Sequence, residues 1–348
     1  MSITSTTHSR NITLDTVKGI GIILIVVGHC FFSFTSYIYL FHMALFFMIS
    51  GYLWDNQRAA DVTSAKRYVL SKLNHLYLPF VICNCSFTLL NNLFLRIGIL
   101  SGDPEFLEMF PSNVLSPHFD LPTLCFELIK HICFIGDTQF GTATWFLRSL
   151  FFVSVVHLIL RYIALHYRHG DKLYYAAIGL AMFGTVFFAR TDYSLIGGLQ
   201  SCFPGYVAFL FGILLKRLSH LELFKHPSLV MSACSFFVLL ILDSCGSVSV
   251  GTGKVTGLLF YSVAAFAGWF LVYPVADRLP AVLKSTIAYV GKRSLWIVML
   301  HYLAFKPVTF AYLYLSDSNM LGLAKFPVFG HLTWLKVVYA IVGTMLPL

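Results

Sequence analysis

The chain has 348 residues, of which 58% are hydrophobic, 16% aromatic and only 11% charged, and its mean hydropathy is +0.78. Soluble domains carry charge on about a quarter of their residues, so this chain has too few polar side chains to cover a water-soluble surface and is expected to fold in a lipid bilayer. The formal net charge of +9 could suggest nucleic acid as a ligand. The Lys and Arg residues flank apolar segments instead of forming one polar face, which argues against nucleic acid and favours a role in membrane orientation.

The polar segment 1–18 opens the chain, and the apolar run after it lacks the small-residue cleavage site of a secretory signal. We therefore expect 1–18 to remain as a cytoplasmic N-terminal segment. About ten apolar runs follow that are long enough to cross the hydrocarbon core. They are 19–35, 37–53, 76–98, 143–165, 173–189, 194–215, 228–243, 255–276, 286–307 and 332–348. These runs predict an all-α, polytopic membrane helical bundle with one domain over 1–348, in which 122–136 is either a loop or an interfacial or re-entrant helix.

The cations of the loops fix the predicted orientation. They follow the second, fourth, sixth and eighth runs, and they also precede the first run, as Arg10, Lys18, Arg58, Lys66, Arg67, Lys72, Arg168, Lys172, Lys216, Arg217, Lys225, Arg278 and Lys284. The loops between them are poor in cations. Because short cytoplasmic loops are enriched in Lys and Arg, both termini are predicted to be cytoplasmic.

Common catalytic and metal-binding patterns are missing from the sequence. The eight cysteines lie mostly inside apolar runs with no Cys-x-x-Cys pair, and we interpret them as packing residues. The sequence has no Gly-x-Ser-x-Gly elbow, phosphate-binding Walker loop, dinucleotide fingerprint or His-Glu-x-x-His. Hydrolases of the soluble type, ATPases, oxidoreductases and zinc peptidases therefore lack support.

The first apolar run contains a histidine that is expensive to place in lipid. His29 follows Lys18 by eleven positions, so a helix would separate the two residues by roughly 16 Å, about half of the hydrocarbon core. This predicts Lys18 at the cytoplasmic surface and His29 near the middle of the membrane. A neutral imidazole there can remove a proton from a hydroxyl or become acylated. Alternatively, it only hydrogen-bonds a neighbouring helix.

Three further polar residues lie, like His29, within apolar runs. His42 begins the second run, one short turn after His29, and His301 lies late in the ninth run. Both can line the same outward-facing cavity as His29, or each can be an interfacial histidine with its bonds satisfied. Arg148 lies close to the outer end of the fourth run. It is expected to snorkel to the interface, or to meet a substrate oxyanion or an acidic group.

These residues resemble the membrane acyltransferase-3 family. The family signature is an Asp, then an Arg-Gly pair, then an apolar helix ending in His, and Asp15, Lys18-Gly19 and His29 reproduce its spacing. Lys18 replaces the usual Arg, which keeps the charge but loses the planar guanidinium fork. A lysine here is similar to the branch that acetylates fucose or lipid-linked sugars.

Further strings resemble family elements in the same order. They are 41–53, where Ala44 stands at a position commonly occupied by proline, and then 145–147, 209–212 and 291–301. Together with the first signature they extend from residue 10 to about 301. The resemblance therefore covers most of the chain.

The resemblance implies a membrane O-acyltransferase that uses acyl-CoA, usually acetyl-CoA, as donor. The implied acceptor is a hydroxyl of a surface glycan or lipid-linked saccharide across the bilayer. His29 is then the catalytic residue, as base or acyl carrier, and Lys18 lies near the CoA entrance. Candidates for the active-site cavity are His42, Arg148, His301, Ser50 and Asp15.

Location and partners follow from the same resemblance. The chain is expected in the bacterial cytoplasmic membrane among lipids, with polysaccharide-assembly proteins as partners. No bound cofactor and no metal are expected. The main alternative is a transporter of glycans or lipid-linked sugars, which would also need such helices and intramembrane histidines but no CoA-dependent histidine. A scaffold protein would leave the arrangement of Lys18 and His29 unexplained.

Overall fold

The computed structural model describes residues 11–330 and 332–348, and it is built almost entirely from helices. The first half contains α1 (Ile12–His29), α2 (Thr35–Tyr39), α3 (His42–Tyr52), η1 (Asn56–Ala59), α4 (Val62–Lys72), η2 (Leu73–Tyr77), α5 (Leu78–Arg96), α6 (Pro104–Met109), α7 (Leu121–Ile132), η3 (Thr142–Thr144) and α8 (Trp145–His166). The second half contains α9 (Gly170–Arg190), η4 (Ile196–Ser201), α10 (Cys202–Leu218), α11 (Glu222–Lys225), α12 (Leu229–Cys245), α13 (Leu258–Arg278), α14 (Ala281–Lys292), α15 (Ser294–Leu315), η5 (Met320–Ala324) and α16 (Thr333–Met345). Strands β1 (Val248–Ser249) and β2 (Lys254–Val255) pair as a short antiparallel hairpin. The predicted all-α bundle is confirmed, whereas Arg10, a predicted cytoplasmic cation, lies outside the described residues.

Seven helices in the described part of the chain are long and apolar enough to cross a membrane. They are Ile12–His29, Val62–Arg96, Thr142–His166, Gly170–Arg190, Ile196–Leu218, Leu258–Arg278 and Ser294–Leu315. The other three predicted runs correspond to shorter helices, α3, α12 and α16. With 11 residues in α3 and 13 in α16, these two are about 16–20 Å long, less than the hydrocarbon core. The prediction of ten full-length runs is therefore revised to seven long helices and three short ones.

The bounds of two predicted runs were wrong, and polar side chains explain one of these errors. Helix α1 begins at Ile12 instead of residue 19, since Asn11 caps its first turn and Thr13 donates to Asp277 at 3.0 Å. Because these hydrogen bonds satisfy polar side chains of 11–18, this segment is helical although its hydropathy is low. The run 286–307 is divided at Arg293 into α14 and α15, so His301 lies in the first half of α15 and not late in a run. The uncertain segment 122–136 contains helix α7.

Helix starts follow the rules of N-terminal capping. A side-chain oxygen of the residue before the helix accepts a hydrogen bond from a backbone N–H of the first turn, which would otherwise lack a partner. This occurs at Asn11, Asp61, Asp103, Asp120 and Ser228, which precede α1, α4, α6, α7 and α12. Local sequence thus fixes where five of the helices begin.

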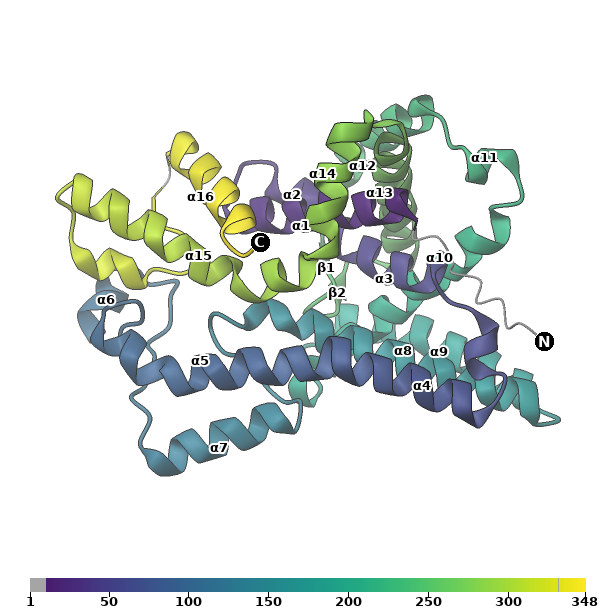
Figure 1. Ribbon diagram of the computed structural model, residues 1–348, viewed down its shortest axis with the longest axis horizontal. Helices are drawn as coiled ribbons and strands as arrows, with labels where there is room; N and C mark the ends of the chain where they lie inside the picture. Colours follow the sequence, from purple (N-terminus) through teal and green to yellow (C-terminus); the bar gives the residue numbers. More distant parts are fainter. Residues whose placement is uncertain (1–10, 331) are drawn as a thin grey trace, which may run out of the picture.

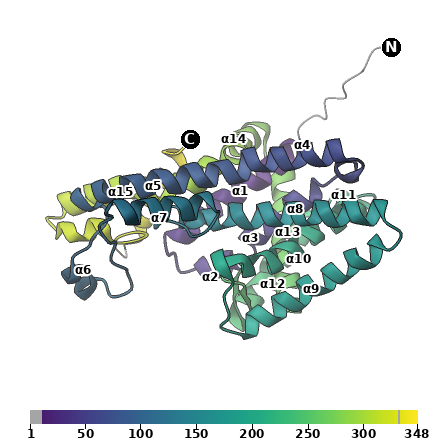
Figure 2. The ribbon, with the colours of Figure 1, turned by 90° about the horizontal axis from the view of Figure 1, so that it is seen from below.

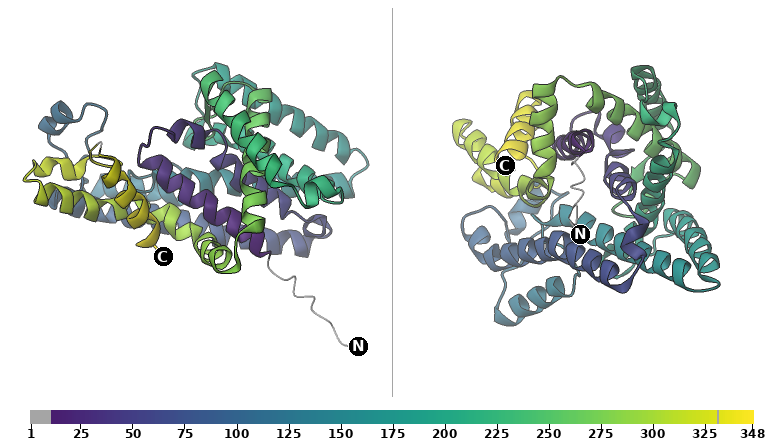
Figure 3. Two further views of the ribbon diagram at one scale, coloured as in Figure 1. Left: turned by 90° about the horizontal axis from the view of Figure 1, so that it is seen from above. Right: turned by 45° about the vertical axis from the view of Figure 1, so that its right-hand side comes forward.

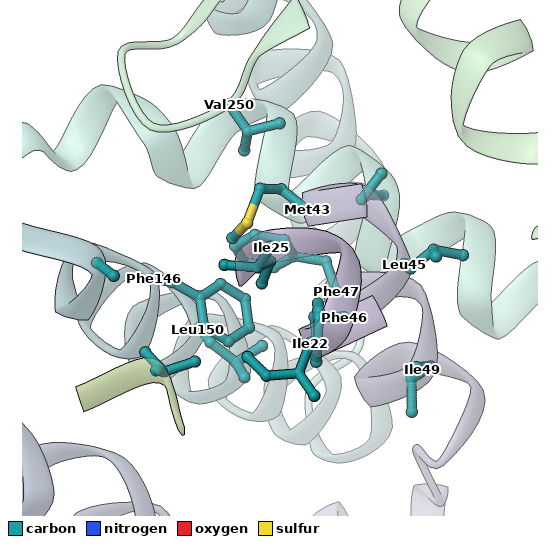
Figure 4. Close-up of a cluster of buried hydrophobic side chains, with 14 of the residues drawn as sticks. Ile22, Ile25, Met43, Leu45, Phe46, Phe47, Ile49, Phe146, Leu150 and Val250 are labelled. Carbon is teal, nitrogen blue, oxygen red and sulfur yellow. The ribbon is translucent and has the colours of Figure 1, made fainter. Parts of the chain in front are cut away.

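Helix α1 lies in the middle of the bundle. It packs against α3, α13, α14, α15 and α16, and the right-hand view of Figure 3 shows it nearly end-on among other helices. The long stretch α4–η2–α5 runs along one edge of the molecule in Figure 1, with α7 beside α5 in Figure 2. The apolar core that joins α1 to α3 and α8 includes Ile22, Ile25, Met43, Phe46 and Phe146 (Figure 4).

Helices α1 and α14 approach so closely that only glycine fits at two positions. A Cβ atom on Gly291 would lie 1.9 Å from the backbone oxygen of Asp15, and one on Gly19 would lie 2.1 Å from that of Ile287. Both distances are far inside van der Waals contact. The polar N-terminal half of α1 is held here, because Thr16 also donates to the backbone oxygen of Lys284 at 3.2 Å.

Loops that share a predicted side of the membrane meet in the structure. His166 lies 3.0 Å from the backbone oxygen of Ala60, and Arg278 donates to that of Pro227 at 2.8 Å. All four lie in or beside loops with predicted cytoplasmic cations. Across the bundle, the loop at Asp192 pairs with Lys254 of the hairpin at 3.1 Å. The structure thus supports the predicted assignment of successive loops to alternating sides of the membrane. Which of the two sides faces the cytoplasm stays a prediction.

We expect Gly291→Ala to destabilise the protein, because the new methyl group would meet the backbone of α1. Overpacking of this kind costs about 1–3 kcal/mol. The matched control is Gly179→Ala in α9, where a Cβ atom meets nothing within 4 Å and the change should be neutral or stabilising by about 0.5–1 kcal/mol. Thermal unfolding in detergent micelles measures both, and equal midpoints for the two variants would contradict the predicted crossing.

Candidate functional site

A cavity of about 550 Å³ opens at the C-terminal end of α1. Its walls come from α1, α2, α3, α8, α15, the loop at 136–137, η3, the turn at 197–198 and the hairpin segment 248–252. Side chains with functional groups that line it include His29, Tyr39, His42, Asp137, Arg148 and Tyr302. Segments far apart in sequence therefore meet around the end of one helix.

His29 is surrounded by two tyrosines. The Tyr302 hydroxyl lies 3.0 Å from Nε2 and 3.1 Å from Nδ1 of His29, and the Tyr39 hydroxyl lies 3.3 Å from Nδ1. Tyr39 also donates to the backbone oxygen of Gly28 at 3.2 Å. Since a hydroxyl has one hydrogen, Tyr39 can only accept from Nδ1 of His29 while that bond persists. This favours the tautomer of His29 with hydrogen on Nδ1 and a lone pair on Nε2.

His42 and His301 have the same tautomer for a simpler reason. Nδ1 of His42 lies 2.9 Å from the backbone oxygen of Ile38, and Nδ1 of His301 lies 2.8 Å from that of Ile297. A carbonyl only accepts, so each Nδ1 carries the hydrogen and each neutral ring has its lone pair on Nε2. The ring of His301 stacks on His29, with centroids 5.3 Å apart and planes at 20°. His301 does not line the cavity, and its Nε2 is buried without a partner in the described part of the chain.

Arg148 forms a buried ion pair on the cavity wall. Its two terminal nitrogens lie 3.0 and 3.3 Å from the carboxylate oxygens of Asp137, and it also donates to the backbone oxygen of Gly136. The guanidinium lies over the ring of Phe80, and the Arg148 side chain is only 4% exposed. Burial raises the pKa of the Asp137 carboxyl, while the charge of Arg148 acts in the opposite direction. Of the two predicted alternatives, Arg148 meets an acidic group and does not snorkel.

A second polar pocket, of about 660 Å³, lies between α3 and α4, among loops with predicted cytoplasmic cations. Its lining residues include Ser50, Arg58, Arg67, Lys72 and His75. Lys72 also lies within electrostatic reach of Lys18 and Arg58. Cations of α1, η1 and α4 are therefore concentrated on this side of the bundle.

The structure separates the predicted site residues into two groups. His29, His42 and Arg148 line the cavity, and His301 lies directly behind His29. Ser50 lines the second pocket, so its assignment to the cavity was wrong.

The other two predicted residues lie on α1. The placement of Asp15 in the cavity was also wrong, since Asp15 is packed against Gly291 and lies 3.8 Å from Lys18. Its backbone position at the crossing with α14 keeps it away from the helix end. Lys18 and His29 belong to the same continuous helix, as predicted.

The sequence interpretation did not identify Tyr39, Tyr302 and Asp137 as site residues. Tyr302 directly follows His301 in the sequence, which is the one signal that could have drawn attention to it. Tyr39 lies in a short helix and Asp137 in a loop, and nothing in the sequence connects either with His29. As for metals, no group of three or more His, Cys, Asp or Glu residues that could hold an ion occurs within 11–330 and 332–348.

Comparison with known proteins gives one match. The family model described as an acyltransferase domain, of the acyltransferase-3 type, matches residues 11–347, essentially the whole chain. No curated protein and no solved structure matches the chain.

We expect Asp137→Asn to destabilise the protein strongly, because it leaves the buried Arg148 charge unpaired. Loss of one partner of a buried pair costs about 3–5 kcal/mol. The control is Asp192→Asn at the exposed ion pair with Lys254, which should cost at most about 1 kcal/mol. Denaturation in mixed micelles compares the two variants. If Asp137→Asn is as stable as the control, the ion pair is not a structural element of the cavity wall.

Proposed function

The chain belongs to the acyltransferase-3 family, and from this premise we propose that it transfers an acetyl group from acyl-CoA to a hydroxyl of a glycan or lipid-linked saccharide. It is a multi-pass membrane acyltransferase. The choice of donor, acceptor and catalytic residue is the part that we propose. We also propose the bacterial cytoplasmic membrane as its location and polysaccharide-assembly proteins as its partners.

One observation carries the proposal, namely that a single helix joins two polar sites. Lys18, near Lys72 of the cation-lined pocket, and His29, in the cavity, both belong to α1 (Ile12–His29), and eleven residues of helical rise separate them by roughly 16 Å. A reaction with a charged donor on one side of a membrane and an acceptor on the other requires such a separation. A scaffold protein has no need of it.

The second pocket has the chemistry for the donor. CoA carries a diphosphate and a 3′-phosphate, and Arg and Lys side chains bind phosphate oxygens by charge-assisted hydrogen bonds. Arg58, Arg67 and Lys72 line this pocket, and Lys18 lies near Lys72. These residues would hold the nucleotide part of acyl-CoA while the thioester extends toward His29.

The cavity has the chemistry for an uncharged polar acceptor. Because Asp137 neutralises Arg148, the wall carries no strong net charge that would select an anion. Thr142, Ser249, Thr252 and Trp145, whose side chains all carry hydrogen-bonding groups, also line it. Mixed apolar and hydrogen-bonding walls of this kind suit a saccharide.

His29 is the best candidate for the reacting group. Its Nε2 lies 3.0 Å from the Tyr302 hydroxyl. When Nε2 bonds to the thioester carbon, this hydroxyl no longer donates to it, and its one hydrogen would be available to the oxyanion. Uncharged imidazole serves both as a base and as a nucleophile.

The first test is transfer of label from radiolabelled acetyl-CoA to endogenous glycan in membranes that contain the wild type, His29→Ala or His169→Ala. His169 is exposed and lies outside both pockets, so His169→Ala should label like the wild type. We expect His29→Ala to lose label by about a hundredfold or more. Equal expression and insertion of the three proteins are checked in parallel.

Two results would contradict this proposal in different ways. If His29→Ala labels glycan as well as the wild type does, the enzyme remains but His29 is not its catalyst. If no protein labels glycan although acceptor is present, transport of a glycan or lipid-linked sugar becomes the better explanation.

We further expect Lys72→Gln to weaken donor binding, because the pocket loses a cation that faces phosphate. One lost phosphate contact corresponds to about a tenfold rise in KM for acetyl-CoA. Lys66→Gln, on the same helix but outside the pocket lining, is the matched control. Acetylated pantetheine lacks the nucleotide phosphates, so its KM should be unchanged by Lys72→Gln, and an equal rise for both donors would place Lys72 outside the phosphate site.

A further inference from the structure

We propose that His42 is the base that takes the proton of the acceptor hydroxyl, and that His29 carries the acyl group between donor and acceptor. This inference rests on the proposed transferase function and assigns separate tasks to two histidines of its site.

The position of His42 supports its role as a base. Its ring lines the cavity, and Nδ1 is fixed as a donor by the backbone oxygen of Ile38 at 2.9 Å. Nε2 is then the unprotonated nitrogen. No polar group among residues 11–330 and 332–348 forms a hydrogen bond with it, so a substrate hydroxyl can occupy that place without displacing a protein group.

The surroundings of His29 suit a nucleophile. Tyr39, which donates to Gly28, is an acceptor for the hydrogen on Nδ1 of His29 and can keep it there. A hydrogen bond at this nitrogen stabilises the positive charge that develops when Nε2 forms a new bond. His301 stacks on the face of the His29 ring and restricts its orientation.

Both imidazoles lie near the ring of Tyr39. The ring centroid of Tyr39 lies 6.3 Å from that of His29 and 5.0 Å from that of His42. Direct transfer from acyl-CoA to a hydroxyl needs one base, whereas double displacement needs a nucleophile and a base. The cavity offers two unprotonated imidazole nitrogens on rings that both lie near Tyr39, and this matches the second requirement.

Bonds, protons and charges balance over the two steps. First, Nε2 of His29 attacks the thioester carbonyl, the C–N bond forms, the C–S bond breaks and CoA leaves as a thiolate, which gives an N-acylimidazolium that keeps its Nδ1 hydrogen. Next, the acceptor oxygen attacks the acyl carbon while His42 takes the hydroxyl proton, the ester C–O bond forms and the C–N bond breaks. His29 is then neutral again. His42 returns its proton to solvent, from which the CoA thiolate takes one, so the sum is an ester and a free thiol.

Isotope exchange tests the proposal without knowledge of the acceptor. The purified full-length protein in detergent is incubated with acetyl-CoA and radiolabelled CoA in the absence of glycan, and label entering acetyl-CoA is measured. Double displacement exchanges label without an acceptor, whereas direct transfer does not. Transfer to endogenous glycan is measured in membranes for the same variants.

His42→Asn is the main variant, since the Asn amide can keep the bond to the Ile38 oxygen while Nε2 is lost. We expect it to retain exchange and to lose glycan transfer by about a hundredfold or more. His29→Gln should lose both. The control is His131→Asn, a buried histidine that bonds Thr88 and does not line the cavity, and it should retain both activities.

Several results would overturn the assignment. Wild-type protein that transfers to glycan but shows no exchange acts by direct transfer, whatever the variants do. If a folded His42→Asn protein loses both exchange and glycan transfer, His42 also acts on the donor. If His42→Asn transfers to glycan as well as the wild type does, His42 is not the base. If the wild type shows neither exchange nor transfer, the proposed function itself fails.

Discussion

The close crossing of α1 and α14 is the constraint on which the rest of the site depends. Where Gly19 and Gly291 meet the opposite backbone, the two helices have no room to slide or rotate. The crossing lies in the polar N-terminal half of α1, beside Lys18, and α1 continues as one rigid helix to His29. Fixing this end of the helix therefore fixes the position of the imidazole at the other end.

Hydrogen-bond satisfaction inside an apolar bundle decides which polar groups are free to react. Lys306, although buried, donates to the backbone oxygens of Leu323 and Lys325, and Arg148 is neutralised by Asp137. Unpaired polar groups are costly where water is excluded, so most of them have protein partners. In the proposed reaction, Nε2 of His42 is open to a substrate hydroxyl, and Nε2 of His29, 3.0 Å from the Tyr302 hydroxyl, must exchange that contact for the acyl carbon.

The two polar sites divide the work of the proposed reaction by charge. Cations collect between α3 and α4, where a phosphate-bearing donor would need them, and the cavity around His29 has its one arginine neutralised. In the proposed reaction, excess positive charge beside the acceptor would attract the phosphates of CoA to the wrong side of the reacting carbon. The ion pair of Arg148 with Asp137 removes that excess charge from the cavity wall.

Composition and helical rise are local properties, and they were enough to predict the membrane class, the apolar runs and the placement of Lys18 and His29 on one helix. Boundaries failed where tertiary contacts compensate for polarity, as at Thr13 and Asp277, or divide an apolar run, as at Arg293. That Tyr39, Asp137 and Tyr302 share one cavity, and that Ser50 and Asp15 lie elsewhere, could be learned from the tertiary contacts alone. Those relations join residues far apart in the chain, and the tautomers of the histidines depend on which atoms the fold places beside each nitrogen, which no local pattern records.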